Sequence, residues 1–267
     1  MDPPPVESAA LTIRKSLETA TVGDGGPEVS TVATSFGTLK GQFIFEGPPQ
    51  VRKLLNADKE QNICAPGGQM PQDNILLIGE NGGIANVVIY AKKTKGKHES
   101  AIQPVNPEVV FDQKQCMFLS PVLAAQVGQT IRIKNSDPIL HNTNISKTSF
   151  NQQIPVKGSL DFPVKSEVLT PIEVSCSIHP WMKAYMLFRK DSYFAVTDKD
   201  GKFEIPNLPA DEEILFQVWH AKAPRGLPAS STVIKADDKG QFKVKLEKDQ
   251  VLDVQQLKVA APALVSG

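Results

Sequence analysis

The chain is broken into many short apolar runs, each of which ends at glycine, proline, asparagine or aspartate. The runs are rich in β-branched and aromatic residues, and several alternate between apolar and polar positions, as half-buried strands do. No segment carries a long, capped pattern with the 3.6-residue period of a helix. This pattern predicts an all-β chain made of sandwiches. The predicted strands lie within residues 39–47, 85–93, 108–113, 116–124, 129–137, 172–176, 185–190, 194–208, 212–221, 231–237 and 241–247.

Changes in composition divide the chain into three parts. Residues 1–36 are rich in proline, serine, threonine, alanine and glycine, with few large apolar residues, so we expect a disordered leader. Residues 37–190 are predicted to form one β-sandwich. Residues 191–260 begin with a hairpin whose turn is Asp200-Gly201, and they are predicted to form a smaller, appended β-sandwich. The first strand, at 39–47, is compatible with either sandwich.

Charge and motif content exclude several classes of function. The 267 residues include 29 basic and 29 acidic side chains, so no basic surplus favours nucleic acid or an anionic membrane. The longest apolar runs fall well short of the ~20 residues that a membrane-spanning helix needs. The sequence has no nucleophile elbow, no His-Glu-x-x-His motif and no glycine-rich phosphate loop. We therefore expect a protein that is not an enzyme.

One short segment carries soft metal ligands at close spacing. Cys176, His179 and Met182 lie at i, i+3 and i+6 between two predicted strands, so they occupy a tight loop. A loop can direct all three side chains to one point, whereas a strand would alternate them between two faces. His141, which follows the predicted strand at 129–137, supplies a second imidazole. One thiolate, two imidazoles and a weak axial thioether are the donor set of an electron-transfer copper site. We predict that Cys176 makes the strong Cu–S bond, that His141 and His179 supply the nitrogens, and that Met182 is the axial ligand.

The same residues resemble the blue-copper (cupredoxin) family. Cys-x-x-His-x-x-Met before the last strand, with an upstream Asn…His-Asn, is similar to plastocyanin, pseudoazurin and, most closely, amicyanin. Over residues 37–222 the chain also resembles bacterial methylamine-utilisation-type proteins, in which a cupredoxin domain precedes a carboxypeptidase-regulatory-like β domain. The residues that carry the resemblance are 82–90, 111–116, 127–142, 176–186 and 193–209.

The resemblance implies a Greek-key cupredoxin sandwich at 37–190, a carboxypeptidase-regulatory-like β domain at 191–260 and a single copper ion. It also implies that Asn142 holds the ligand loops together and that His179 reaches the surface. Trp181 would then offer an apolar docking patch beside His179.

Two alternatives to this interpretation remain, and the first depends on how the three cysteines pair. A Cys64–Cys116 disulfide would leave the Cys176 thiol free, and we favour it for that reason, but the sequence alone does not fix the pairing. A Cys116–Cys176 disulfide would consume the thiolate and leave a metal-free sandwich with a structural or interaction role. The other alternative is a copper storage or delivery protein.

Location and partners follow from this chemistry. A disulfide and a copper carrier both fit an oxidising compartment, so we expect a secreted, periplasmic or extracellular protein whose export signal is not in this sequence. The expected partner is a redox protein, with a cytochrome and a dehydrogenase as the candidates. His98 and His220 lack neighbouring ligands in the sequence and are not expected to bind metal.

Overall fold

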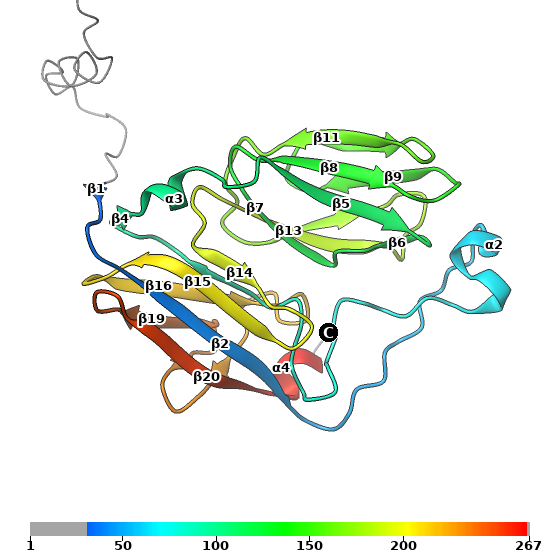
Figure 1. Cartoon of the computed structure of the whole chain (residues 1–267). Coiled ribbons are helices and arrows are strands. Elements are labelled where there is room, and N and C mark those ends of the chain that lie inside the picture. Colours follow the sequence, from blue (N-terminus) through cyan, green and yellow to red (C-terminus); the bar gives the residue numbers. More distant parts are fainter. Residues whose placement is uncertain (1–30, 266–267) are drawn as a thin grey trace, which may run out of the picture. The chain divides into compact units, whose positions relative to one another are not determined.

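The computed structural model describes residues 31–265. The predicted disordered leader therefore lies outside the described residues, apart from residues 31–36, which include strand β1 (Thr31–Val32) and the start of β2. Among the described residues, helix is limited to four short elements: α2 (Gln61–Cys64), η1 (Pro66–Gly68), α3 (Glu99–Ile102) and α4 (Pro262–Val265). In the described part of the chain, no helix is long and apolar enough to cross a bilayer. The prediction of an all-β fold is confirmed (Figure 1).

The first sandwich, named the cupredoxin-like sandwich after the sequence resemblance described above, has two mixed sheets with the orders β10-β9-β12-β13-β7 and β11-β8-β5-β6. Strands β13 and β7 are parallel, as are β5 and β8, and the other pairs are antiparallel. Because several neighbouring strands, such as β9 and β12 or β13 and β7, are not consecutive in the sequence, the connections cross between the sheets as in a Greek key. Its strands are β5 (Glu108–Lys114), β6 (Met117–Phe118), β7 (Val122–Gln126), β8 (Thr130–Asn135), β9 (His141–Ile145), β10 (Asn151–Ile154), β11 (Ser159–Pro163), β12 (Ile172–Ser175) and β13 (Lys183–Arg189).

The core of this sandwich follows from the alternation of its strands. Ile131 and Ile133 of β8 are fully buried, while Thr130, Arg132 and Lys134, which alternate with them, are only partly buried. They belong to one apolar cluster with Phe111, Phe118 and Met186 from neighbouring strands. The pattern of period two therefore places one face of each sheet in a shared core.

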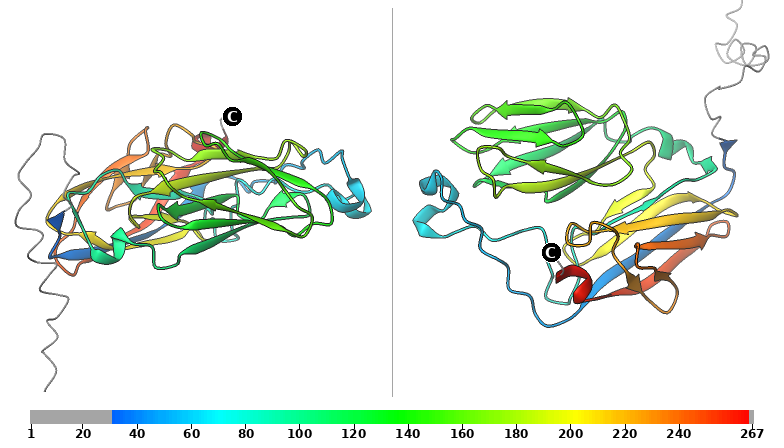
Figure 2. Two further views of the ribbon diagram at one scale, coloured as in Figure 1. Left: turned by 90° about the horizontal axis from the view of Figure 1, so that it is seen from above. Right: turned by 180° about the vertical axis from the view of Figure 1, so that it is seen from behind.

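The second sandwich has the sheet orders β14-β3-β16-β19 and β15-β2-β20-β17-β18, and β1 and β4 form a separate two-stranded sheet. Figure 2 shows this sandwich in two further views. Strand β2 lies between β15 and β20, and it is parallel to β20. Its strands are β2 (Phe36–Glu46), β3 (Val88–Ala91), β14 (Phe194–Val196), β15 (Lys202–Pro209), β16 (Glu213–Trp219), β17 (Ala229–Ser230), β18 (Lys235–Ala236), β19 (Gln241–Lys245) and β20 (Val251–Ala260), with β4 at Gly96–Lys97.

This strand pairing differs from the predicted division at 37–190 and 191–260. Strands β2 and β3 precede the cupredoxin-like sandwich in sequence, yet both pair with strands from beyond residue 190. Leu39 and Phe43 of β2 are fully buried in the second core, which explains why the strand joins that sandwich. With these two strands included, the appended sandwich is not the smaller of the two in the described part of the chain.

The two sandwiches share a small apolar interface. Strand β3 is buried on both faces: Ile89 and Ala91 belong to the second core, and Val88 and Tyr90 to a separate cluster. That cluster also contains Val122, Leu187 and Trp219, which come from both sandwiches. The Arg189 guanidinium lies over the Tyr90 ring at 5.0 Å and donates to the Ala91 carbonyl at 2.9 Å. The described residues thus form one compact unit.

A buried histidine in the second sandwich makes stability depend on pH. Burial, with a smaller contribution from Lys222, lowers the pKa of His220 to about 4, although a backbone hydrogen bond at Ile75 opposes the shift. The unfolded chain takes up this proton near pH 6.5, and the folded chain only near pH 4. The stability that His220 contributes is therefore present above pH 6.5 and is lost as the pH falls towards 4, by up to roughly 3 kcal/mol. Urea titrations between pH 7 and 4.5 should show a steeper loss for the native chain than for His220→Asn. Equal slopes for the two proteins would contradict this assignment.

Candidate metal centre

Two adjacent strands bring the predicted ligands together. Strand β12 ends at Ser175 and β13 begins at Lys183, so Cys176, His179 and Met182 lie on the loop between them, as predicted. The Met182 N–H donates to the His179 carbonyl at 2.9 Å, and the Cys176 N–H donates to the Met182 carbonyl at 3.3 Å. These bonds close the loop tightly. His141 is the first residue of β9, which pairs with β12, and it therefore lies beside Cys176.

Three of the four predicted ligands present their donor atoms to one point. One ring nitrogen each from His141 and His179 and the Cys176 Sγ all lie within 4.8 Å of one another. The His141 Nδ1 is 2.9 Å from the His179 Nδ1, which is 3.8 Å from the Cys176 Sγ. All three side chains are buried, and Met182 is fully buried in the same apolar cluster as Cys176.

A carboxylate holds the outer nitrogen of each histidine. The His141 Nε2 is 2.7 Å from the Asp137 Oδ2, and the His179 Nε2 is 3.1 Å from the Glu60 Oε2. An outer carboxylate fixes the orientation of an imidazole and leaves its other nitrogen facing a metal. Neither carboxylate was predicted from the sequence. Asp137 lies four residues before His141 and was within reach of such reasoning, whereas Glu60 is 119 residues from His179 and gives no local signal.

Electrostatics at the site favour a thiolate beside an imidazolium. Burial acts to raise the pKa of Cys176, but hydrogen bonds from His141, His179 and the Asn142 N–H outweigh it and lower the pKa to about 6. Burial likewise acts to lower the pKa of His141, but Asp137 and Cys176 raise it to about 9. The pKa of Asp137 is lowered: burial opposes the shift, and hydrogen bonds from His141 and from the N–H groups of Cys116 and Gln115 outweigh it. The thiolate is the form of cysteine that binds metal.

Asn142 and the cysteines lie as the sequence analysis favoured. The Asn142 N–H donates to the Cys176 Sγ at 3.3 Å, and its Oδ1 accepts from the Ser177 N–H at 3.2 Å. This residue therefore links the two ligand loops, which confirms its predicted role. Cys64 and Cys116 form a disulfide and Cys176 is free, so the Cys116–Cys176 alternative is wrong.

The prediction that His179 reaches the surface is wrong. Its side chain is fully buried, and Glu60 lies against its outer nitrogen. Trp181 is only partly buried, but it packs against the core and its ring centroid lies 5.1 Å from that of His179. The indole N–H donates to the Cys116 carbonyl at 3.1 Å. Trp181 therefore joins the ligand loop to the disulfide instead of forming a free apolar patch.

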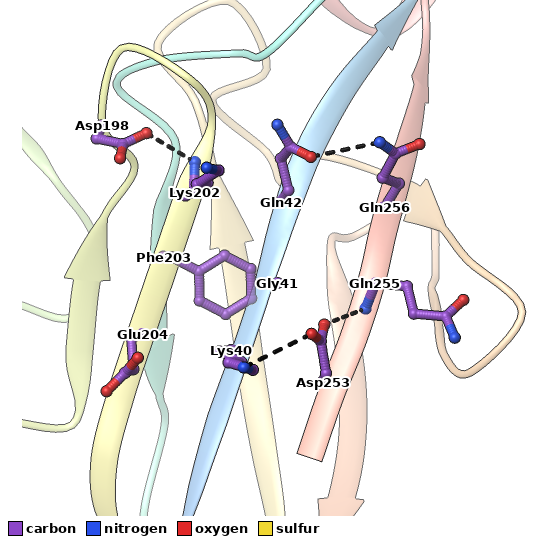
Figure 3. Close-up of a pocket in the computed structure, with 10 residues that line it drawn as sticks. All are labelled: Lys40, Gly41, Gln42, Asp198, Lys202, Phe203, Glu204, Asp253, Gln255 and Gln256. Atoms are coloured by element: carbon purple, nitrogen blue, oxygen red, sulfur yellow. Dashed lines mark hydrogen bonds and ion pairs between the residues drawn. The ribbon is translucent and has the colours of Figure 1, made fainter. Parts of the chain in front are cut away.

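A surface depression on the second sandwich is a weaker candidate for a binding site than the metal centre. It lies on the sheet formed by β15, β2 and β20, around the Phe203 ring (Figure 3). Its polar side chains largely bind one another: Lys40 pairs with Asp253, and Gln256 donates to Gln42. Phe203 is only 6% exposed, so its ring offers little face to a ligand. The candidate metal centre is therefore the better-organised site.

The donor set fits copper. Two imidazole nitrogens and a low-pKa thiol converge in a buried space, with Met182 in the same cluster, and this combination suits copper better than hard, oxygen-preferring cations. His141 and His179 would hold the ion through Nδ1, because each Nε2 is occupied by a carboxylate.

No protein-family model matches this chain, and no curated protein matches it. Among solved structures, it is similar to amicyanin from Paracoccus versutus (Thiobacillus versutus), with 16% identity over 38% of this chain and 97% of that chain and a TM-score of 0.28. It is also similar to a mutant amicyanin in its reduced Cu(I) form at pH 4, with 15% identity over 33% of this chain and 87% of that chain and a TM-score of 0.28. TM-scores this low support no inference by themselves, so the fold rests on the strand topology.

Proposed function

We propose that this chain binds one copper ion through His141, Cys176, His179 and Met182 and carries single electrons between redox partners. The observation that supports this most is the convergence of the two Nδ1 atoms and the Cys176 Sγ, with both Nε2 atoms held by carboxylates. The stability of an apolar core does not require an oriented pair of imidazoles beside a thiol of lowered pKa.

Each of these residues has a distinct part in the proposed site. Copper, when bound, would supply the one-electron redox chemistry. Cys176 provides the thiolate, which two N–H groups stabilise, from Asn142 at 3.3 Å and from His179 at 3.4 Å. Asp137 and Glu60 hold the two imidazole rings in place, and burial keeps water away from the sulfur. Because the sandwich fixes these groups before metal arrives, a change of oxidation state would require little rearrangement.

The copper assignment predicts a colour that depends on Cys176. Titration of the reduced-thiol, metal-free chain with Cu(II) should reach one equivalent and give an intense thiolate-to-copper absorption, with reversible reduction. Cys176→Ala should remove that absorption while the far-ultraviolet circular dichroism stays that of a β protein. A control is Cys64→Ser with Cys116→Ser, which removes the other two cysteine sulfurs and should retain a thiolate-to-copper absorption. An unchanged spectrum in Cys176→Ala would refute the ligand assignment.

The second candidate function is copper storage or delivery. The free, low-pKa thiol at the site is compatible with this function as well. Such a protein would bind Cu(I) and give it up readily to a chelator, whereas a carrier should retain the ion in both oxidation states. Under the carrier proposal the chain is not an enzyme. Its partner would be a redox protein such as a cytochrome or a dehydrogenase, in a periplasmic or extracellular compartment.

A further inference from the structure

An excursion of the chain before β3 covers one end of the candidate metal centre. Its stem is closed by the Leu55 N–H, which donates to the Pro71 carbonyl at 2.8 Å, and by the Asp73 N–H, which donates to the Lys53 carbonyl at 2.8 Å. Between these bonds, residues 56–70 carry α2 and η1, and we call them the cap segment. Figures 1 and 2 show α2 at one end of the cupredoxin-like sandwich.

The cap segment touches the ligand loop at several points. The Glu60 Oε2 lies 3.1 Å from the His179 Nε2, and the Lys59 Nζ donates to the Ile178 carbonyl at 2.8 Å. Ala57 and Ala65 are buried in the same apolar cluster as Cys176 and Met182. The Glu60 side chain is 44% exposed and His179 is fully buried, so the carboxylate lies between this ring and solvent.

Glu60 holds this position with an unusual backbone. Its φ of 41° and ψ of 45° fall in the left-handed region, which residues other than glycine rarely occupy. A conformation of this kind persists only where the surroundings enforce it, and it is often found at functional sites. The fixed points around Glu60 are its contact with His179 and the disulfide four residues further on.

The Cys64–Cys116 disulfide anchors the cap segment directly beside the site. Both sulfur atoms lie within 4.8 Å of a ring nitrogen of His179. On the other side of the bond, the Cys116 N–H donates at 2.9 Å to Asp137, whose carboxylate also holds His141. One covalent bond therefore connects the groups that hold both candidate ligands.

We propose that the cap segment is a disulfide-anchored lid on His179 and that Glu60 is its positioning residue. The lid holds the His179 ring and keeps water and partners from the outer nitrogen of that ring. The role of the lid rests on the proposed copper function, whereas its geometry does not. A dithiol reductant would open the lid: it transfers two electrons and two protons to the disulfide, leaves two thiols on the chain, and is itself oxidised to a disulfide. The cap segment would then be held by Glu60, Lys59 and the apolar packing of residues such as Ala57, Ala65, Ile63 and Met70.

The test measures access to His179 in the metal-free chain. Diethyl pyrocarbonate acylates accessible, unprotonated imidazoles, and peptide mass spectrometry assigns the rate to each histidine. His98, which is partly exposed, and His220, which is fully buried, serve as internal standards. In the native chain His179 should react at a rate close to that of His220. In Glu60→Ala, and in Cys64→Ser with Cys116→Ser, it should react at least about tenfold faster, the change that corresponds to 1.4 kcal/mol in local opening.

Asp58→Ala is the matched control. It removes an exposed carboxylate of the cap segment whose one hydrogen-bond partner among the described residues is Asn56, and it should leave the His179 rate unchanged. The proposal is overturned if His179 of the native chain reacts as fast as His98. It is also overturned if the His179 rate in both variants equals the rate in the native chain. If His220 also becomes reactive in the double serine variant, that variant has unfolded, and Glu60→Ala alone decides.

A second measurement separates positioning from simple cover. In copper-loaded protein, Glu60→Gln should restore the native absorption spectrum that Glu60→Ala alters, because the amide oxygen still accepts from the His179 Nε2–H. Identical spectra for both variants would remove Glu60 from the positioning role. Since the acylation experiment needs no metal, a chain that binds no copper would defeat the proposed function and leave the result on the lid intact.

Discussion

Replacing Asp137 by alanine should lower the free energy of unfolding by about 3–5 kcal/mol, the cost of removing one partner from a buried ion pair. Asp137 is 3% exposed and accepts three hydrogen bonds, from the N–H groups of Gln115 (2.7 Å) and Cys116 (2.9 Å) and from the His141 Nε2 (2.7 Å). In the variant the Cys116 N–H and the His141 Nε2, both in buried residues, would lose this partner, as would the N–H of the exposed residue Gln115. His141 would also lose the group that orients it, and the loss of such a partner typically weakens metal binding by about 10–100-fold.

Denaturant unfolding of the metal-free chain measures the first effect, and competition with a copper chelator measures the second. Asp137→Asn should fall between the native chain and the alanine variant, because its amide oxygen still accepts but carries no charge. Asp161→Ala is the matched control: this carboxylate is about half exposed and pairs with Arg132 on the surface, so its loss should cost no more than about 1 kcal/mol. An alanine variant at position 137 with the native unfolding midpoint would show that the carboxylate is dispensable.

The part of the site that was predictable from sequence is the part encoded locally. Cys176, His179 and Met182 share one short loop between two strands, so their spacing alone placed them together. His141 was predictable because a ligand-type residue directly follows a strand of the same sandwich. The donor atoms of His141, Cys176 and His179 converge and Met182 is buried in the same apolar cluster as Cys176, and copper binding by these four residues stays a prediction.

The partners that surround the ligands were not predictable, because they depend on distant chain segments. Glu60 reaches His179 only through a loop with no regular periodicity, and the anchoring disulfide had an alternative pairing until the fold was known. The predicted exposure of His179 was wrong for the same reason. The ligand loop itself would leave the ring near the surface, but a segment more than a hundred residues away in the sequence covers it.

The predicted boundary between the sandwiches was wrong because β2 and β3 pair with strands that are distant from them in the sequence. Consecutive strands are usually adjacent in a sheet, which favours assigning β3 to the sandwich that follows it, whereas the strand at 39–47 was compatible with either sandwich. Here Thr38 pairs with Val251 and Val88 with Trp219, so the second sandwich takes strands from both sides of the first. The apolar content of β2 and β3 predicted their strand character correctly, but it carried no information about which strands they would join.

The disulfide should contribute about as much to stability as any other single feature of the cupredoxin-like sandwich. It joins two cysteines that are 52 positions apart in the sequence, for which the loss of unfolded-chain entropy corresponds to about 4 kcal/mol. Cys64→Ser with Cys116→Ser should therefore lower the free energy of unfolding by a value of this order. The loss should appear mainly as a lower denaturant midpoint, measured on the metal-free chain under conditions that keep the native disulfide intact. His220→Asn, on the other sandwich, is the control for additivity: at neutral pH its effect should add to that of the disulfide, because the two sites share no partner. A double serine variant with the native midpoint would mean that the cap segment is held by its other contacts alone, and the disulfide would then have no part in closing the lid on His179.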